Sequence, residues 1–198
     1  MKSTAYDRWL TACLGVALAF FTGAASAQWE LDSDRSRLSF ISVKNASVGE
    51  VHTFKTLKGT VGDDGGAQVA IDLDSVETAI PIRNKRMREM LFETGNFPSA
   101  SITTSVAPEL IEQARKGPTE VSVPLTVELH GSSASYDAAV LVSVAGDGSL
   151  HVATREPIVV DAGDFELGAG VTALKEVAGL ASISTSVPVS AYLVFDPG

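Results

Sequence analysis

Apolar residues recur at every second position along most of the chain, which is the spacing of strands that bury one face. Residues 68–75 alternate in this way, with Val69, Ile71 and Leu73 inward, and so do residues 121–129. The inward positions of the second segment are Val121, Val123, Leu125, Val127 and Leu129. The last strand keeps one face apolar with Ile183, Val187, Val189, Leu193 and Phe195. Turns rich in Gly, Asp and Ser separate such segments, for example at 62–66 and 131–133, and short turns of this kind join antiparallel strands. The pattern predicts an all-β protein with about eight antiparallel strands.

Eight antiparallel strands can close into a barrel whose interior holds side chains or one small ligand. An open two-sheet sandwich with the same number of strands is the alternative. Residues 51–61 have no uniformly polar face, as expected for a strand with a core on one side and a helix or ligand on the other. Pro124 lies on the outer face of its strand and lacks a ladder donor, which predicts a bulge or an unpaired stretch there.

The spacing of apolar residues changes from the strand period to a helical one between Ser75 and Ala100. Met87, Met90 and Leu91 stand at i, i+3 and i+4, the spacing of a helical stripe. The same segment carries four cations, at Arg83, Lys85, Arg86 and Arg88. We expect a short amphipathic helical insertion that covers or lines the mouth of the barrel. A second short helix is expected within 161–177, whereas 108–118 is read equally well as a helical turn or a long loop.

The first 27 residues have the anatomy of a signal peptide. Lys2 and Arg8 precede an apolar run at 9–21, and small residues at 25–27 end in the A-x-A form that precedes cleavage. We expect a signal peptide at 1–27, a mature domain at 28–198 and a periplasmic location. The apolar run is shorter than the ~20 residues that span a bilayer, which argues against a retained anchor.

Cys13 is the only cysteine of the sequence. The apolar run follows it instead of preceding it, so its surroundings do not fit a lipidation site. A mature chain without this residue has no disulfide, no thiolate chemistry and no zinc-cysteine site. Loss of the leader takes the formal net charge from −9 to −10, because the leader holds two cations and one carboxylate. Such acidity disfavours nucleic acid as a partner.

The candidate ligand-binding residues are the large apolar side chains near the expected mouth and two cations beside them. Methionine adapts to irregular chains, aromatic rings give broad apolar contact, and arginine binds carboxylate or phosphate. The alternative is that the apolar group fills a closed core and the cations form a solvated helix face. The candidates are Phe40, Phe54, Arg83, Arg86, Met87, Met90, Leu91, Phe92 and Phe97.

Catalytic and metal-binding patterns are missing from the sequence. His52, His130 and His151 lie on separate predicted strands and show no HxH or HExxH spacing. No nucleotide-binding fingerprint and no nucleophile elbow is present. We therefore expect a protein that is not an enzyme and that needs no cofactor or metal.

Four segments together resemble the YceI-like family of bacterial periplasmic proteins. They are WELDSDRSRLSF, SVETAIPIRNKRMREMLFETGNFPSASITT, PLTVELHG and AGLASISTSVPVSAYLVF, and the resemblance runs in order over nearly all of 28–195. It implies a lipocalin-like eight-stranded barrel with a long apolar cavity that binds polyisoprenoid or other long-chain amphiphilic lipids. The family's usual Arg-Asp and His-Leu pairs are Arg83-Asn84 and Arg86-Met87 here, and its His-Gly-Val-Thr-Lys-Pro run is HGSSA at 130–134.

Three functions are consistent with these observations. The leading one is a periplasmic carrier for a long-chain isoprenoid or a related fatty lipid. The second is an interaction protein whose basic helix docks a partner, for example a membrane redox protein. The third is a lipid-modifying enzyme, which the absent catalytic motifs disfavour. The oligomeric state and the ligand's chain length are left open by the sequence.

Overall fold

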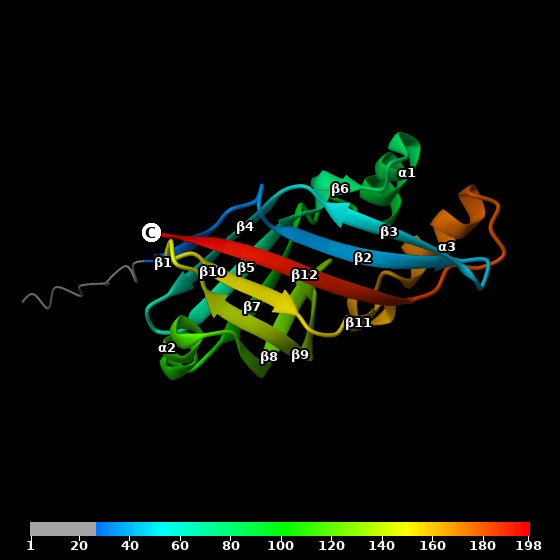
Figure 1. Cartoon of the computed structure of the whole chain (residues 1–198). Coiled ribbons are helices and arrows are strands. Elements are labelled where there is room, and N and C mark those ends of the chain that lie inside the picture. The colour runs from blue at the N-terminus through cyan, green and yellow to red at the C-terminus, as the bar shows by residue number, and fades with distance from the viewer. Residues whose placement is uncertain (1–26) are drawn as a thin grey trace, which may run out of the picture.

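The computed structural model describes residues 27–198 (Figure 1). The expected signal peptide lies outside the described residues except for Ala27, so its cleavage stays a prediction. Within the described residues, no helix is both long enough and apolar enough to cross a bilayer.

Antiparallel strands make up most of the described chain. Their bounds are β1 (Ala27–Leu31), β2 (Arg37–Lys44), β3 (Val48–Phe54), β4 (Leu57–Gly62), β5 (Gly66–Asp72), β6 (Val76–Glu77), β7 (Ser99–Ser105), β8 (Thr119–Leu129), β9 (Ser132–Val144), β10 (Leu150–Thr154), β11 (Ile158–Asp161) and β12 (Ser186–Pro197). The strands are joined in the order β1-β4-β5-β7-β8-β9-β10-β12, and β12 pairs with β1 to close the ring. The closed barrel is confirmed over the open sandwich.

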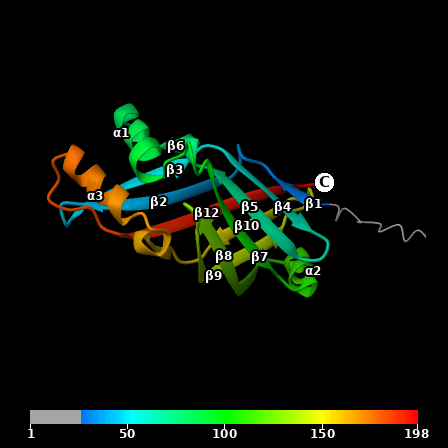
Figure 2. The ribbon, with the colours of Figure 1, turned by 180° about the vertical axis from the view of Figure 1, so that it is seen from behind.

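Several short strands occur in consecutive pairs, and the two members of each pair are the halves of one bent strand. β1 and β2 follow each other along β12, and β10 and β11 follow each other along its other side. β3 and β4 likewise pair with β2 and β1. β5 and β6 likewise pair with β4 and β3. Joining the halves of these four pairs gives the expected eight strands. Beyond the ring, the β2–β3 hairpin extends past the barrel toward the end where the helices gather (Figures 1 and 2).

The inward phase changes between β3 and β4. His52 and Phe54 are buried in β3, whereas Leu57 and Val61 are buried in β4, so the alternation shifts between even and odd positions. Lys55 donates its backbone N–H to the carbonyl of Ser75 at 3.1 Å, which holds the chain at this bend. The shift explains why no face of 51–61 is uniformly polar in the sequence.

The helices lie at the two ends of the barrel. α1 (Pro81–Arg86) and α3 (Gly168–Val177) cover one end, and α2 (Pro108–Lys116) covers the other (Figure 1). Short 3-10 turns, η1 (Leu73–Ser75) and η3 (Ala162–Phe165), follow β5 and β11. The ambiguous segment at 108–118 is therefore a helix, with a proline at its first position and Ile111 and Ala114 buried against the barrel.

The insertion after α1 is not one regular helix. A π-helical turn, η2 (Met87–Leu91), continues α1, and the N–H of Phe92 donates to the carbonyl of Met87 at 2.9 Å. The wider turn puts Met87 and Phe92 on the same face, and both are 6% exposed. Met90, which the helical spacing grouped with Met87, is instead only half-buried.

Candidate ligand-binding site

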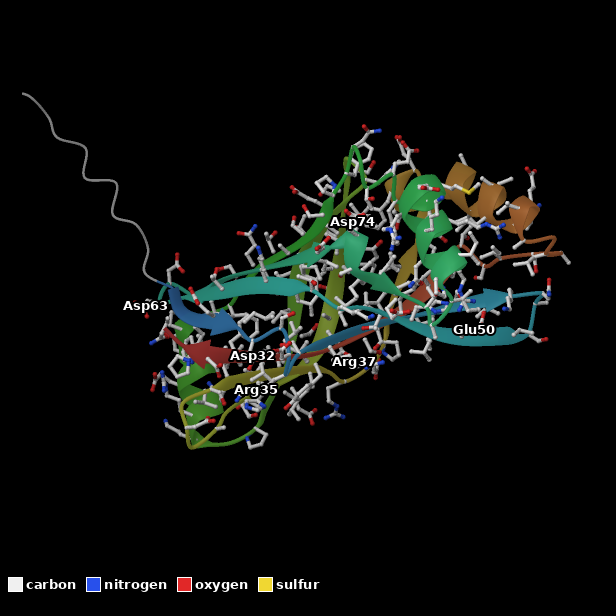
Figure 3. The ribbon with its side chains drawn as sticks, turned by 90° about the horizontal axis from the view of Figure 1, so that it is seen from above. Asp32, Arg35, Arg37, Glu50, Asp63 and Asp74 are labelled. Atoms are coloured by element: carbon white, nitrogen blue, oxygen red, sulfur yellow. The ribbon has the colours of Figure 1, made fainter. Side chains whose placement is uncertain are left out.

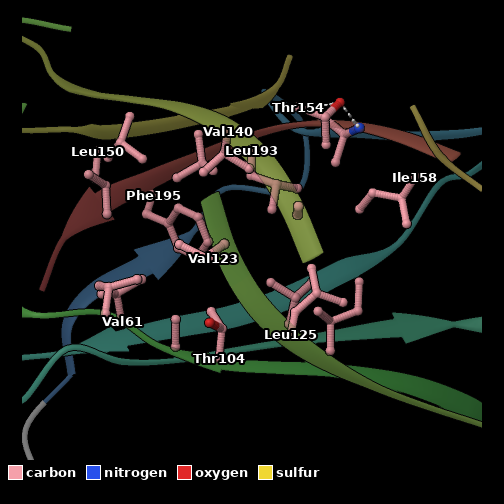
Figure 4. A pocket seen from close by; sticks show the side chains of 18 of the residues that line it. Val61, Thr104, Val123, Leu125, Val140, Leu150, Thr154, Ile158, Leu193 and Phe195 are labelled. Carbon is pink, nitrogen blue, oxygen red and sulfur yellow. Dashed lines mark hydrogen bonds between the residues drawn. The ribbon is translucent and has the colours of Figure 1, made fainter. Parts of the chain in front are cut away.

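Two apolar chambers lie end to end inside the barrel. The α2 chamber has a volume of about 150 Å³ and includes Leu110 and Ile111 of α2 in its wall. Figure 4 shows Val61, Val123 and Phe195 among the side chains that line it. The lid chamber has a volume of about 180 Å³ and reaches Leu91, Phe92 and Val171 under η2 and α3. A single water needs only about 10–15 Å³ of such space. Each chamber is therefore large enough for a segment of an organic ligand.

The chambers meet at a ring of residues that line both of them, which we call the waist. The waist consists of Leu38, Ile102, Leu125, Ile158 and Val189. These side chains come from opposite walls of the barrel, so the two chambers adjoin along its axis, and we call the two chambers together the tunnel. A chain that fills both chambers must pass the waist.

The tunnel wall offers almost no polar group to a ligand. Within the described chain, Thr104 and Thr154 are the polar residues of the wall, and both lie in the α2 chamber. The Thr104 hydroxyl donates to the carbonyl of Pro124 at 2.7 Å, and the Thr154 hydroxyl accepts from the N–H of Ala191 at 3.1 Å. Such a wall binds hydrocarbon and cannot pair with a polar group held inside it.

η2 and α3 pack closely over the lid chamber. A Cβ atom at Gly170 would lie 2.7 Å from the carbonyl oxygen of Met90 and 2.9 Å from the Cα of Leu91. Gly170 therefore sets the distance between the two elements. We call η2 and α3 together the lid.

Gly170→Ala is expected to push α3 away from η2. Contacts this short are relieved only by backbone movement, so we expect a loss of about 1–3 kcal/mol in the free energy of unfolding. Hydrogen exchange at residues 87–92 should also become faster. Gly168→Ala is the matched control, since a Cβ there meets nothing within 4 Å. Equal behaviour of the two variants in urea unfolding and exchange would contradict this packing.

Four of the seven apolar candidates line the lid chamber, namely Phe40, Phe54, Leu91 and Phe92. Met87 is buried beside them in the same apolar cluster but does not reach the chamber wall. Met90 also stays off the wall, because the π turn rotates it to the side. Phe97 lines neither chamber, and its ring centroid lies 4.4 Å from that of His130. Contact of the first four with a ligand stays a prediction.

The two candidate arginines differ in their surroundings. Arg83 donates to the Glu50 carboxylate at 2.8 Å and to the carbonyl of Thr78 at 2.7 Å. These bonds link α1 to the β2–β3 hairpin. Figure 3 shows Glu50 on this hairpin, beside the helices. Lys44, at 2.6 Å, and then Arg83 hold the pKa of Glu50 below its usual value. Arg86 makes no ion pair within residues 27–198.

A buried polar layer adjoins the lid chamber. His52 is 3% exposed, its Nε2 lies 2.8 Å from the hydroxyl of Ser42, and its ring is packed against Phe40 with 5.2 Å between centroids. Its Nδ1 and the Nε of Arg83 are buried without hydrogen-bond partners. Burial, and secondarily the charge of Arg83, lowers the pKa of His52 below the ordinary 6.5. The layer was not predicted, since the sequence marks His52 only as one of three scattered histidines.

The buried, neutral His52 predicts acid sensitivity of the fold. Because the unfolded chain binds a proton at His52 near pH 6.5 while the folded chain resists it, the free energy of unfolding should decrease as the pH falls below about 6.5. One such group changes the free energy of unfolding by at most about 1.4 kcal/mol per pH unit. Urea unfolding from pH 7.5 to 5 should show this component in the wild type and lose it in His52→Phe. Parallel pH profiles would contradict the assignment.

No catalytic arrangement is evident at the polar layer. The Ser42–His52 pair has the spacing of a nucleophile and its base, yet no carboxylate within the described chain hydrogen-bonds to His52 Nδ1. Within residues 27–198 there is also no group of three or more His, Cys, Asp or Glu side chains that could hold a metal ion. The expectation of no enzymatic activity stays a prediction.

The YceI-like domain model matches residues 29–195. The chain belongs to the YceI-like family. Its fold also matches solved structures. A polyisoprenoid binding domain from Saccharophagus degradans, implicated in plant cell wall breakdown, is 35% identical, with 87% of this chain and 100% of that domain covered and a TM-score of 0.84.

Burkholderia cenocepacia BcnA is 20% identical, with 83% of this chain and 98% of BcnA covered and a TM-score of 0.63. At this identity the likeness supports the YceI-like fold alone. No curated protein sequence matches the chain. The family and the barrel expected from the resemblance are therefore confirmed.

Most of the tunnel wall of this YceI-like chain was not among the predicted site residues. Val69, Val123 and Phe195 were recognised as inward-facing, but their alternation does not distinguish a filled core from a lined cavity. Phe165 and Leu167 lie in the η3 region, whose irregular pattern gave no signal. The site is built mainly from ordinary strand residues.

Proposed function

We propose that this protein is a non-enzymatic carrier that binds a long-chain isoprenoid lipid in the tunnel. The observation that supports this most is the pair of adjoining apolar chambers that make up the tunnel and meet at the waist. Membership of the YceI-like family agrees with it, as does the 35% identity to a domain described as polyisoprenoid binding.

The hydrophobic effect is large enough for such binding. Each buried CH₂ contributes about 0.8 kcal/mol, so one isoprene unit supplies roughly 3–4 kcal/mol before the cost of ordering the chain is subtracted. A few units therefore reach useful affinity without any polar contact. The dependence of affinity on chain length is the distinctive property of this mechanism.

A series of all-trans isoprenoids of increasing length tests the proposal. We expect the dissociation constant to fall by roughly tenfold with each added unit until the tunnel is full, and then to level off. Linear fatty acids serve as a comparison series of similar apolar area without methyl branches. An affinity that is absent, or that does not change with chain length, would refute the carrier function.

The periplasmic location belongs to the same proposal. It is supported by the signal peptide anatomy of residues 1–27. Expression of the full sequence in a Gram-negative bacterium should yield a periplasmic protein that starts at Gln28, as determined by mass spectrometry. An unprocessed protein in the cytoplasm would contradict this location.

The second candidate function, docking of a protein partner through the basic helix, has one structural observation in its favour. Ile80 and Ile82 at the start of α1 are exposed, and they lie beside Lys85 and Arg86 in the sequence. Lys85→Glu combined with Arg86→Glu should abolish capture of a membrane redox partner while leaving lipid binding intact. Arg83 is unsuitable for this test, because its reversal would break the pair with Glu50. Loss of lipid with capture intact would contradict the docking function.

A further inference from the structure

Most of the exposed large apolar side chains of the described chain gather at the lid end of the barrel. Within residues 27–198 seven such side chains are exposed, and five of them lie on the β2–β3 hairpin, at the start of α1 or on α3. Single exposed apolar residues are ordinary, whereas a group of them at one end of a molecule marks a surface that binds something. The five are Val48, Val51, Ile80, Ile82 and Val177.

The start of α1 combines two of these side chains with positive charge. Ile82, Lys85 and Arg86 stand at i, i+3 and i+4, positions that share one side of a helix. Ile80 directly precedes the helix, and the two isoleucines are 41% and 54% exposed. Figures 1 and 2 show α1 standing out from the barrel at the lid end. We call Ile80, Ile82, Lys85 and Arg86 the docking face.

The positive charge of this region is not neutralised within the described residues. The full chain has a formal net charge of −9, yet α1 and η2 together carry four cations and one carboxylate, Glu89. The Lys85 ammonium lies 3.8 Å from Glu89 in an exposed pair, which contributes little, and Arg86 makes no ion pair within residues 27–198. The neighbouring carboxylates of Glu50 and Glu77 each already pair with another cation. The docking face therefore attracts anions.

We propose that the docking face binds the surface of an anionic lipid bilayer. The isoleucines enter the head-group region, and Lys85 and Arg86 lie against lipid phosphates. This inference rests on the proposed function, because a carrier of a lipid chain exchanges that chain with a membrane. α1 runs directly into η2, and Leu91 of η2 lines the lid chamber. Docking thus places the lid chamber beside the bilayer, where a chain passes between them with little exposure to water.

A bilayer fits the docking face better than a folded protein partner does. A stable protein interface takes roughly 20–30 residues from each side. α1 has only six residues and protrudes from the barrel. A bilayer surface accepts a protruding segment of this size, because apolar side chains enter the head-group boundary individually and each nearby Lys or Arg adds attraction to anionic lipid.

Co-sedimentation of the periplasmic protein with lipid vesicles tests the docking face. One set of vesicles is phosphatidylcholine alone, the other contains one third phosphatidylglycerol, and neither contains isoprenoid. We expect the protein to bind the phosphatidylglycerol vesicles at least about tenfold more tightly at low salt. The difference should shrink as salt is added, because the range of exposed charges falls to about 3 Å at 1 M.

Charge reversal then locates the cations. Lys85→Glu combined with Arg86→Glu should weaken binding to phosphatidylglycerol vesicles by at least about 20-fold. The matched control is Lys58→Glu combined with Lys116→Glu, which changes the net charge equally at two exposed cations on β4 and α2. This control should lose less than about threefold, since its two sites lie away from the docking face.

Apolar substitution locates the isoleucines. Ile80→Ser combined with Ile82→Ser should weaken binding to both kinds of vesicle, whereas Val159→Ser should not, although Val159 is 59% exposed. None of the substituted residues lines either chamber. All variants should therefore keep the wild-type affinity for a C40 isoprenoid in solution.

Each contrary result overturns a stated part of the inference. A protein that binds C40 isoprenoid but neither kind of vesicle would overturn membrane docking and leave the carrier function standing. Equal losses in the docking-face and control variants would show that this face is not the one that binds. Capture of a protein partner by the docking face, with no vesicle binding, would make it a protein interface instead. Vesicle binding by a protein that takes up no isoprenoid would refute the carrier function alone.

Discussion

Leu125→Trp is expected to divide the tunnel at the waist and to weaken binding of a C40 isoprenoid by at least about 100-fold. Leu125 lines both chambers, so an indole ring at this position fills the passage between them. A long chain then loses the α2 chamber and with it about half of its buried CH₂ groups, which accounts for a loss of several kcal/mol. A C15 isoprenoid, which fits the lid chamber alone, should keep its affinity within about threefold. Both affinities can be measured by isothermal titration calorimetry.

The control for this variant is Val159→Trp. Val159 is 59% exposed on the outer wall of β11, so the same new side chain adds no bulk to the tunnel. Both variants should be compared at matched stability, because overpacking at the waist costs about 1–3 kcal/mol. Unchanged C40 binding by a folded Leu125→Trp protein would show that the chain does not pass the waist.

Trp29→Ala should give the largest loss of stability, about 3–5 kcal/mol in the free energy of unfolding. Trp29 is 2% exposed in the core cluster near α2, and its Nε1–H donates to the carbonyl of Gly148 at 2.9 Å. The guanidinium of Arg115 on α2 lies 5.4 Å from its ring centroid. The side chain thus ties β1, the β9–β10 turn and α2 together where β1 closes the barrel against β12.

Urea unfolding followed by circular dichroism measures this loss, since the variant removes the tryptophan that fluorescence would report. Trp29→Phe is the graded control, because it keeps most of the apolar contact and loses the hydrogen bond, and a loss of about 1–2 kcal/mol is expected. A loss below 1 kcal/mol for Trp29→Ala would mean that barrel closure does not depend on this residue.

The strands were predictable because each has one face in the core. Val69, Ile71 and Leu73 were expected to point inward, and all three are buried. Closure into a barrel, in contrast, depends on the pairing of β1 with β12, two segments at opposite ends of the described chain. Alternation within a strand carries no information about such a long-range pair, so the barrel was a choice between two architectures until the resemblance was considered.

The position of the helical insertion in the lid was predicted correctly, but its detailed conformation was predicted wrongly. The change of period correctly marked a helical insertion between Ser75 and Ala100. The prediction from the i, i+3, i+4 spacing of Met87, Met90 and Leu91 required a regular helix. The structure instead has a π turn at 87–91, which puts Phe92 on the same face as Met87 and leaves Met90 off the tunnel wall. Whether this turn is α-helical or π-helical is decided by its packing against α3 and the barrel. The local sequence contains no information about that packing.

The charged candidates show the same limit. The cluster from Arg83 to Arg88 was apparent from composition, but the partner of Arg83 lies far away in sequence. Arg83 is paired with Glu50, which is 33 residues away on the hairpin. The burial of His52 next to Arg83 and Phe40 was likewise apparent only from the fold.

Native mass spectrometry of the protein purified from a bacterial periplasm tests the central claim most directly. The account predicts one isoprenoid per protein, which is identified after organic extraction. Leu125→Trp purified in parallel should lack it or hold a shorter lipid. An empty wild-type protein that also fails to take up added C40 isoprenoid would contradict the carrier function.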